Sequence, residues 1–306
     1  MRSKLFVPGS RPELFNKALS GPADAISIDL EDAVLEARKA EARSTVREFL
    51  RKLSTGRSLG SGSAAAPEPV HGKIVIVRVN AMTTLHFNDD LAAVTWPALH
   101  AINVPKIESS EEVQSVSDTL ARLERERGIV QPIGILVNIE SPRGLRRAAE
   151  IAAAGPRVIG LQVGFGDLFE PLSIDRSDRE AVHHVQLAVR FAAGEAGVPA
   201  YDGAFANVGD LDGFRVESEH ACRLGFAGKS CIHPSQVPVA NEVFRPSDDE
   251  IGFADRVLTA WVDAERRGLG AITVEGHMVD RPMIERAYAI MAVAEREGLG
   301  RFAKNT

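Results

Sequence analysis

Two patterns of apolar and polar residues alternate along the chain. In the first, short runs of β-branched and other apolar residues end at glycine, proline or charged residues, which is typical of buried parallel strands. In the second, apolar residues recur at three- and four-residue steps, as between Glu111 and Arg127, which predicts an amphipathic helix. Eight runs are predicted as strands: Lys4 to Val7, Ala25 to Leu30, Lys73 to Val79, Ala101 to Val104, Ile133 to Ile139, Arg157 to Val163, Pro199 to Tyr201 and Ala227 to Ile232.

Strands that alternate with helices form parallel sheets joined by crossover helices. Eight such units are enough to close a sheet on itself, so we predict an α/β fold, a (β/α)8 TIM barrel over residues 1–245. The open-sheet alternative that binds nucleotides would need a Gly-rich fingerprint, and the sequence contains none. Residues 54–72 are rich in Gly, Ser, Ala and Pro, which predicts a surface loop before the third strand.

The remaining residues, 246–306, are predicted to form a C-terminal helical extension. A helix near Asp248 to Arg267 precedes the segment AITVEGHMVDRP, and a second helix begins at about Pro282 because proline fits the first helical turn. A short arm followed by a helix could cover the mouth of its own barrel or that of a neighbouring subunit.

Composition narrows the class of protein. The chain has 306 residues, 44% of them apolar, and a net charge of -6 that is spread along the sequence, so we expect no nucleic-acid or membrane-surface partner. Cys222 and Cys231 lack the spacing of a metal or disulfide motif and are predicted to be reduced thiols. With no leader-like apolar segment at the N-terminus and no membrane-length apolar run, the expected location is the cytoplasm.

Polar residues follow the predicted strands at the point where each one ends. Active sites of eight-stranded α/β barrels lie at this end of the strands, so we expect the side chains to share one face. Taken singly, each could instead cap a helix or face solvent. The residues are Asp29, Glu31 and Asp32 in SIDLEDAV, then Arg78, Asn80, Lys106, Glu140, Asp167, Asp202 and His233.

Two of these carboxylates are the predicted metal ligands. Glu140 in VNIES and Asp167 in VGFGDL each follow an apolar run, on strands that are consecutive in the chain. Oxygen ligands without paired His or Cys suit a hard cation such as Mg²⁺, which keeps several waters. Arg78 should stand at the rim of the barrel, where it either binds an anionic intermediate or forms a structural ion pair with Asp29 or Asp32.

Motifs along nearly the whole chain resemble those of the HpcH/HpaI aldolase/citrate lyase family, in particular its citrate lyase β-subunit-like members, which include malyl-CoA and citramalyl-CoA lyases. The resemblance is carried, in order, by RSKLFVPGSRPELFNKA, DAISIDLEDAV, VRVN, VPKIES, NIESPRGL, GFGDL, GFAGKSCIHPSQ and GHMVDRP.

The resemblance implies a barrel that binds Mg²⁺ through Glu140 and Asp167, with Arg78 contacting the substrate. It implies that Asp280 reaches the site of an adjacent subunit in a homotrimer or hexamer. Asp29 and Asp32 are assigned to the catalytic group, holding Arg78 or metal-bound waters, as Glu31 would. The resemblance also indicates that three further residues contact a coenzyme A thioester: Arg11, Lys17 and His233.

The implied activity is cleavage or condensation of a 3-hydroxyacyl-CoA thioester, with acetyl-CoA and a 2-oxoacid on the other side of the reaction. Two alternatives stay open: a metal-dependent aldolase acting on free 2-oxoacids, and a citryl lyase subunit that needs a carrier protein. The sequence does not distinguish malyl, methylmalyl, citramalyl and citryl thioesters, because they differ by small groups that only the shape of a pocket can select.

Overall fold

The computed structural model describes residues 1–55 and 72–299. The chain divides into two compact units, Met1–Glu242 and Val243–Thr306. Most of the predicted loop at 54–72 lies outside the described residues.

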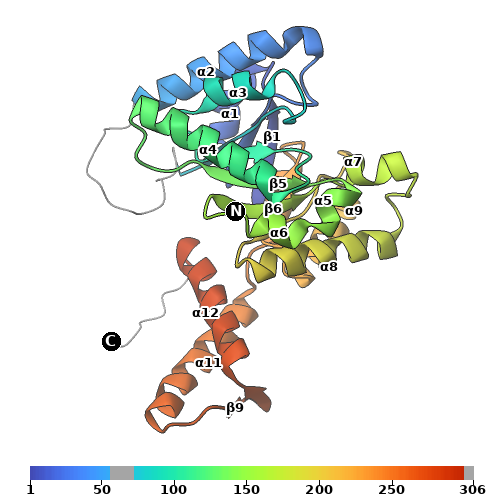
Figure 1. Ribbon diagram of the computed structural model, residues 1–306. Coiled ribbons are helices and arrows are strands. Elements are labelled where there is room, and N and C mark those ends of the chain that lie inside the picture. The colour runs from blue at the N-terminus through green and yellow to red at the C-terminus, as the bar shows by residue number, and fades with distance from the viewer. Residues whose placement is uncertain (56–71, 300–306) are drawn as a thin grey trace. The chain divides into compact units, whose positions relative to one another are not determined.

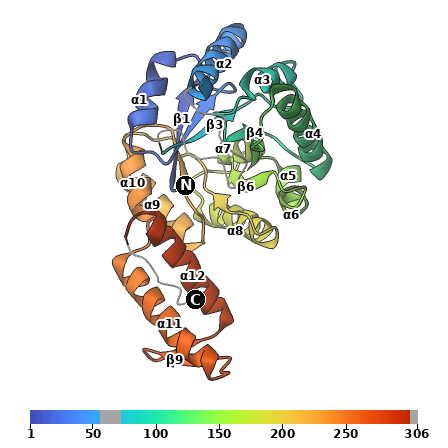
Figure 2. The ribbon, with the colours of Figure 1, turned by 90° about the vertical axis from the view of Figure 1, so that its left-hand side faces the viewer.

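The first unit is a barrel of eight parallel strands, which confirms the predicted fold class (Figures 1 and 2). The strands pair in the order β7-β6-β5-β4-β3-β2-β1-β8, and a parallel bridge between Asp202 and Lys229 joins the two ends. The strands are β1 (Ser3–Pro8), β2 (Ala25–Asp29), β3 (Ile74–Arg78), β4 (Ala101–Val104), β5 (Gly134–Ile139), β6 (Val158–Val163), β7 (Ala200–Tyr201) and β8 (Lys229–Cys231).

Helices cover the outside of the barrel and connect the end of each strand to the start of the next (Figure 2). The predicted helix from Glu111 is confirmed: the Ser109 side chain caps its first turn, and Gly128, with φ of 63°, ends it. The α-helices of this unit are α1 (Phe15–Ser20), α2 (Lys39–Thr55), α3 (Phe87–Val94), α4 (Ser110–Arg127), α5 (Pro142–Arg146), α6 (Ala148–Ala152), α7 (Phe165–Phe169), α8 (Arg179–Glu195), α9 (Leu211–Arg223) and α10 (Gln236–Val243).

Strand register decides which residues become neighbours at the carboxyl rim. Asp29 pairs with Arg78 across β2 and β3, and Ile139 pairs with Val163 across β5 and β6. Glu140 and Gly164, the next residue of each strand, therefore leave the sheet side by side. The predicted strand ends are thus brought to one rim by parallel pairing alone.

The second unit consists of two helices and a short hairpin. Its helices are α11 (Asp248–Arg266) and α12 (Arg281–Arg296), close to the predicted positions, and its strands are β9 (Ile272–Val274) and β10 (His277–Val279). The hairpin was not predicted, because its two-residue turn places Glu275 at φ of 50°, a conformation that glutamate seldom adopts. In the described part of the chain, no helix combines the length with the apolar character that crossing a membrane requires.

The barrel core predicts which substitutions destabilise the protein. Leu136 on β5 is fully buried in a cluster with Ala25, Ile76 and Ala101. We expect Leu136→Ala to lower the free energy of unfolding by about 2–5 kcal/mol, because the lost methyl groups leave a cavity. Urea denaturation measures the change. Leu85→Ala is the control, since Leu85 is 96% exposed; equal stability of the two variants would contradict the described packing.

Candidate active site at the carboxyl rim

Arg78 is held at the end of β3 by the carboxylate that ends β2. Its Nε and Nη2 donate to the two oxygens of Asp29, both at 2.7 Å, in a bidentate pair. Backbone N–H groups of Glu31 and Ala33 also donate to Asp29. Burial acts to raise the pKa of Asp29, but Arg78 and these N–H groups outweigh it and hold the pKa below its usual value. Arg78 therefore has a fixed orientation.

Two further carboxylates face the remaining nitrogen of Arg78. Nη1 lies 2.9 Å from Glu31 Oε2 and 3.1 Å from Asp32 Oδ2. The Glu31 contact lacks the geometry of a hydrogen bond, so among the described residues this buried oxygen has no hydrogen-bond partner. Burial, opposed by Arg78 and reinforced by Asp32, raises the pKa of Glu31 to about 7. Asp32, at 59% exposed, is the most accessible of the three carboxylates around Arg78.

Glu140 is buried directly after β5, and both of its oxygens have defined donors. The backbone N–H of Lys106 donates to Oε1 at 2.7 Å, and the Asn138 side chain donates to Oε2 at 3.1 Å. Gly164 is required beside it, because a Cβ at that position would lie 2.2 Å from Glu140 Oε2. Burial, together with the nearby charges of Glu31 and Asp167, raises the pKa of Glu140 to about 7.

Lys106 links this carboxylate to the others. Its backbone has φ of 53°, a strained conformation for a non-glycine residue, and it directs the N–H toward Glu140. Its Nζ lies 3.1 Å from Asp167 Oδ1 and 3.4 Å from Glu31 Oε1. The Lys106 ammonium group therefore lies between two carboxylates, one that follows β2 and one on α7, which follows β6.

The donor set fits a magnesium ion. Five carboxylates gather at this rim. In the described part of the chain four of them form ion pairs with Arg78 or Lys106, and the fifth, Glu140, accepts hydrogen bonds from uncharged donors. Excess negative charge in a partly dry site favours a further cation. The described residues contain no group of three or more His, Cys, Asp or Glu side chains preformed to hold a metal. Glu140 and Asp167 with water ligands match Mg²⁺, which needs only one or two carboxylates.

The residues assigned to coenzyme A contacts follow two neighbouring strands. Arg11 and Lys17 follow β1, His233 follows β8, and β1 pairs with β8. All three side chains are exposed. Arg11 pairs with Glu13, and the His233 ring lies 2.8 Å from Ser235 Oγ. Asp280 belongs to the second unit, where it precedes α12 without capping that helix through its side chain.

Two polar residues at strand ends serve the scaffold instead. Asn80 donates to Asp90 and to the Leu30 carbonyl, and Asp202 binds Lys229 and Gln186 in the interior. Neither side chain is therefore among the groups that contact Arg78 or Lys106 in the described part of the chain. Each satisfies buried neighbours, since unpaired polar groups are costly there.

The structure also brings in residues for which the sequence predicted no role or only a secondary one. Lys106, noted only as a strand-end residue, contacts three of the carboxylates. Asn138 was missed entirely, although a polar residue inside the apolar run LVNI was a usable signal.

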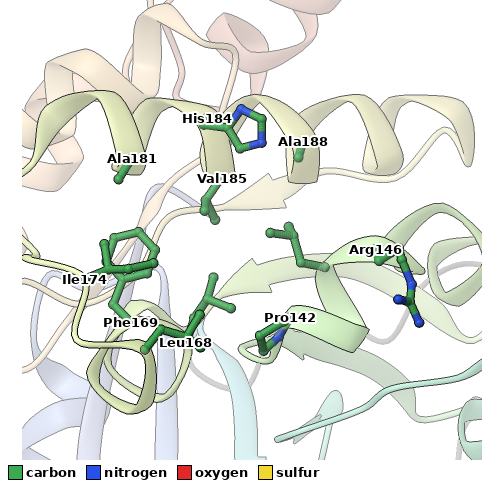
Figure 3. A pocket seen from close by; sticks show the side chains of 11 residues that line it. Pro142, Arg146, Leu168, Phe169, Ile174, Ala181, His184, Val185 and Ala188 are labelled. Carbon is green, nitrogen blue, oxygen red and sulfur yellow. The ribbon is translucent and has the colours of Figure 1, made fainter.

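A pocket of about 480 Å³ lies elsewhere on the barrel, between α8 and the α5 and α7 segments (Figure 3). Its walls are mostly apolar, with Leu168, Phe169 and Val185 facing one another and Arg146 at one end. None of the predicted catalytic, metal or coenzyme residues lines it. We place the chemistry at the rim, because that is where acidic and basic groups converge.

Comparisons with known proteins identify the family. The model of the HpcH/HpaI aldolase/citrate lyase family matches residues 2–234. A (3S)-malyl-CoA thioesterase of Cereibacter sphaeroides is 37% identical over 295 residues, covering 96% of this chain and 94% of the relative. An L-malyl-CoA/beta-methylmalyl-CoA lyase of the same species is 32% identical over 315 residues, covering 96% of this chain and 94% of the lyase.

A solved structure is similar over nearly the same length. The crystal structure of the protein CitE from Mycobacterium tuberculosis, in complex with magnesium, acetoacetate and coenzyme A, has a TM-score of 0.72 and 32% identity. The match covers 96% of this chain and 100% of that one.

The two glycines of GFGDL give a matched test of the metal site. A methyl group at Gly164 would displace the Glu140 carboxylate, whereas a Cβ at Gly166 has nothing within 4 Å. We expect Gly164→Ala to weaken Mg²⁺ or Mn²⁺ binding by about tenfold or more, and Gly166→Ala to leave it unchanged. Calorimetric titration without substrate measures both. Equal metal affinities in the two variants would count against Glu140 as a ligand.

Proposed function

The chain belongs to the HpcH/HpaI aldolase/citrate lyase family, and from that premise we propose that it is a Mg²⁺-dependent carbon-carbon lyase of 3-hydroxyacyl-CoA thioesters. Malyl-CoA or citramalyl-CoA is the proposed substrate, and acetyl-CoA and a 2-oxoacid are the products of cleavage. The excess of carboxylates over cations at the rim carries the proposal. An anionic hydroxyacyl group can enter there only if a further cation offsets that charge.

Glu140 and Asp167 are the proposed ligands of the metal. Mg²⁺ bound there would supply a Lewis acid for the hydroxyl and carboxylate oxygens of the substrate. The buried Glu140 carboxylate is fixed by its two donors, while Asp167 is 39% exposed and can approach ligand and solvent. Lys106, which occupies the space between Asp167 and Glu31, would turn its ammonium group toward the substrate carboxylate.

Cleavage moves one proton and one pair of electrons before the products separate. The 3-hydroxyl loses its proton, its carbon becomes the carbonyl of the 2-oxoacid, and the broken C–C bond leaves its electrons on the thioester fragment as an enolate. Glu31 is the proposed acceptor of this proton, because burial raises its pKa to about 7, a value suited to a general base. Arg78, oriented by Asp29 and Asp32, stabilises the developing negative charge.

Two further parts of the proposal rest on the family motifs. Asp280, from the arm of an adjacent subunit in a homotrimer or hexamer, would protonate the methyl carbon of the enolate. Arg11, Lys17 and the segment at His233 would bind coenzyme A, with the basic side chains near its phosphates. These residues follow β1 and β8, whereas Glu140 and Asp167 follow β5 and β6, so the thioester would extend across the rim.

A second candidate activity is hydrolysis of the same thioester. The 37% identity to a (3S)-malyl-CoA thioesterase favours it. Hydrolysis would release free coenzyme A and a hydroxyacid, whereas the lyase releases an acyl-CoA and a 2-oxoacid. The products of one reaction mixture therefore distinguish the two activities.

The first experiment supplies malyl-CoA, citramalyl-CoA and citryl-CoA to the purified protein, with Mg²⁺ or with EDTA, and measures 2-oxoacid and free thiol separately. We expect EDTA-sensitive release of 2-oxoacid from one thioester. Glu140→Gln and Asp167→Asn should each lower turnover on the order of 100-fold or more, because each removes a main electrostatic group. Release of free thiol without 2-oxoacid would show that the activity is that of a thioesterase and not of a lyase. Near-native turnover in both variants would reject the metal assignment.

Complementation tests the shared site. Asp280→Asn and Glu140→Gln should each be inactive alone, with Asp280→Asn retaining metal binding. Co-expressed, the two variants should regain part of the activity, because a mixed oligomer can pair an intact metal site with an intact arm. The control co-expresses Glu140→Gln with Asp167→Asn, which damage the same site and cannot complement. No gain over this control would remove Asp280 from the neighbour's site.

A further inference from the structure

Below the rim, the barrel interior contains a group of buried polar side chains. Lys4 on β1, Asn103 on β4, Asn138 on β5 and Gln162 on β6 are each no more than 4% exposed. The strands β1, β4 and β6 are not neighbours in the sheet. Contacts of Lys4 with Asn103 and Gln162 therefore run through the middle of the barrel.

These side chains form a continuous line of hydrogen bonds that ends at the proposed metal ligand. Lys4 Nζ donates to Asn103 Oδ1 at 3.0 Å, and Asn103 Nδ2 donates to Asn138 Oδ1 at 2.7 Å. Asn138 Nδ2 then donates to Glu140 Oε2 at 3.1 Å. Lys4 Nζ also donates to Gln162 Oε1, and this hydrogen bond forms a side branch that does not lead to Glu140.

The two ends of the line fix its direction. The Leu136 carbonyl can only accept, and Asn103 Nδ2 donates to it at 3.1 Å, while the Glu140 carboxylate accepts at the far end of the line. Asn103 must therefore turn its oxygen toward Lys4 and its nitrogen toward Asn138. Asn138 in turn directs its oxygen toward Asn103 and its nitrogen toward Glu140. Amide orientation, which is otherwise ambiguous, is determined at both asparagines. Successive bonds with one direction also strengthen one another.

We propose that Lys4 and Asn103 are positioning residues for the metal site: they orient Asn138, which holds the Glu140 carboxylate in the orientation that binds Mg²⁺. The inference rests on the proposed function, since it concerns the same ligand. Asn138 occupies one lone pair of Oε2 and the Lys106 N–H one of Oε1, so the other lone pairs are presented to the cation. Outer partners of this kind set the direction and basicity of metal ligands.

Lys4 is buried below the rim, and this line joins it to Glu140. Its Nζ lies 4.4 Å from the centroid of the Phe6 ring, and the Arg78 guanidinium carbon lies 5.1 Å from the same centroid. The ring thus stands next to both cations, and Lys4 itself is 2% exposed. A covalent role for this lysine would require access that the structure does not give it.

The test compares two variants that each remove one acceptor of Lys4. Asn103→Leu breaks the line to Glu140, whereas Gln162→Met removes only the side branch. Both leave Lys4 short of one partner, so both should lower the thermal midpoint. Only Asn103→Leu should weaken Mn²⁺ binding, by about tenfold or more, measured by electron paramagnetic resonance without substrate. Activity lost in this variant should return at high Mg²⁺ concentration, which a general loss of folded protein would not allow.

A double variant keeps the test usable if Asn103→Leu does not fold. Lys4→Met with Asn103→Leu replaces both partners of one buried hydrogen bond by apolar groups, a change that is often tolerated. It should show the same loss of Mn²⁺ affinity, because Asn138 still lacks its donor. Native Mn²⁺ affinity in either folded variant, or an equal loss in Gln162→Met, would overturn the inference. Absence of Mn²⁺ binding in the unaltered protein would instead reject the proposed metal site.

Discussion

The concentration of negative charge at the carboxyl rim is the constraint on which the rest of this structure depends. Parallel pairing brings the ends of β2, β5 and β6 together, and with them come Asp29, Glu31, Asp32, Glu140 and Asp167. Partial burial makes their mutual repulsion stronger than it would be in water. Arg78, with its bidentate pair, and Lys106, with its strained backbone, lower that repulsion in the protein itself. The proposed magnesium ion would supply the remaining positive charge.

Two of the buried polar systems in the described part of the chain lie below this rim. One runs through the barrel from Lys4 to Glu140 and ends at the site. The other lies between the barrel and its helices, where Lys229 binds Asp202 and Glu217. The second closes the gap between β7 and β8, because Asp202 also forms the bridge there. Buried lysines thus have different tasks: one joins the barrel to its helix layer, and one is proposed to orient a ligand.

The two sides of the rim carry different kinds of side chain. Carboxylates and their cations occupy the ends of β2 to β6, while the basic and imidazole groups of Arg11, Lys17 and His233 follow β1 and β8. A substrate with a hydroxyacid at one end and phosphates at the other matches this division. The division also explains why the apolar pocket beside α8 is a poor candidate for the reaction: it contains no carboxylate that could hold a cation.

The sequence by itself determined the barrel, its strands and the residues at their ends, because periodicity and β-branched runs are local properties and parallel closure follows from them. It also indicated Glu140, Asp167 and Arg78 as neighbours of one site. Only the tertiary structure decided that Asp29 binds Arg78, which lies 49 residues away in the sequence. It also decided that Gly164 leaves space for the Glu140 side chain, and that Asp202 binds Gln186 in the interior instead of facing the rim. Side-chain partners across a barrel depend on register, rotamer and mutual burial, which no local pattern contains.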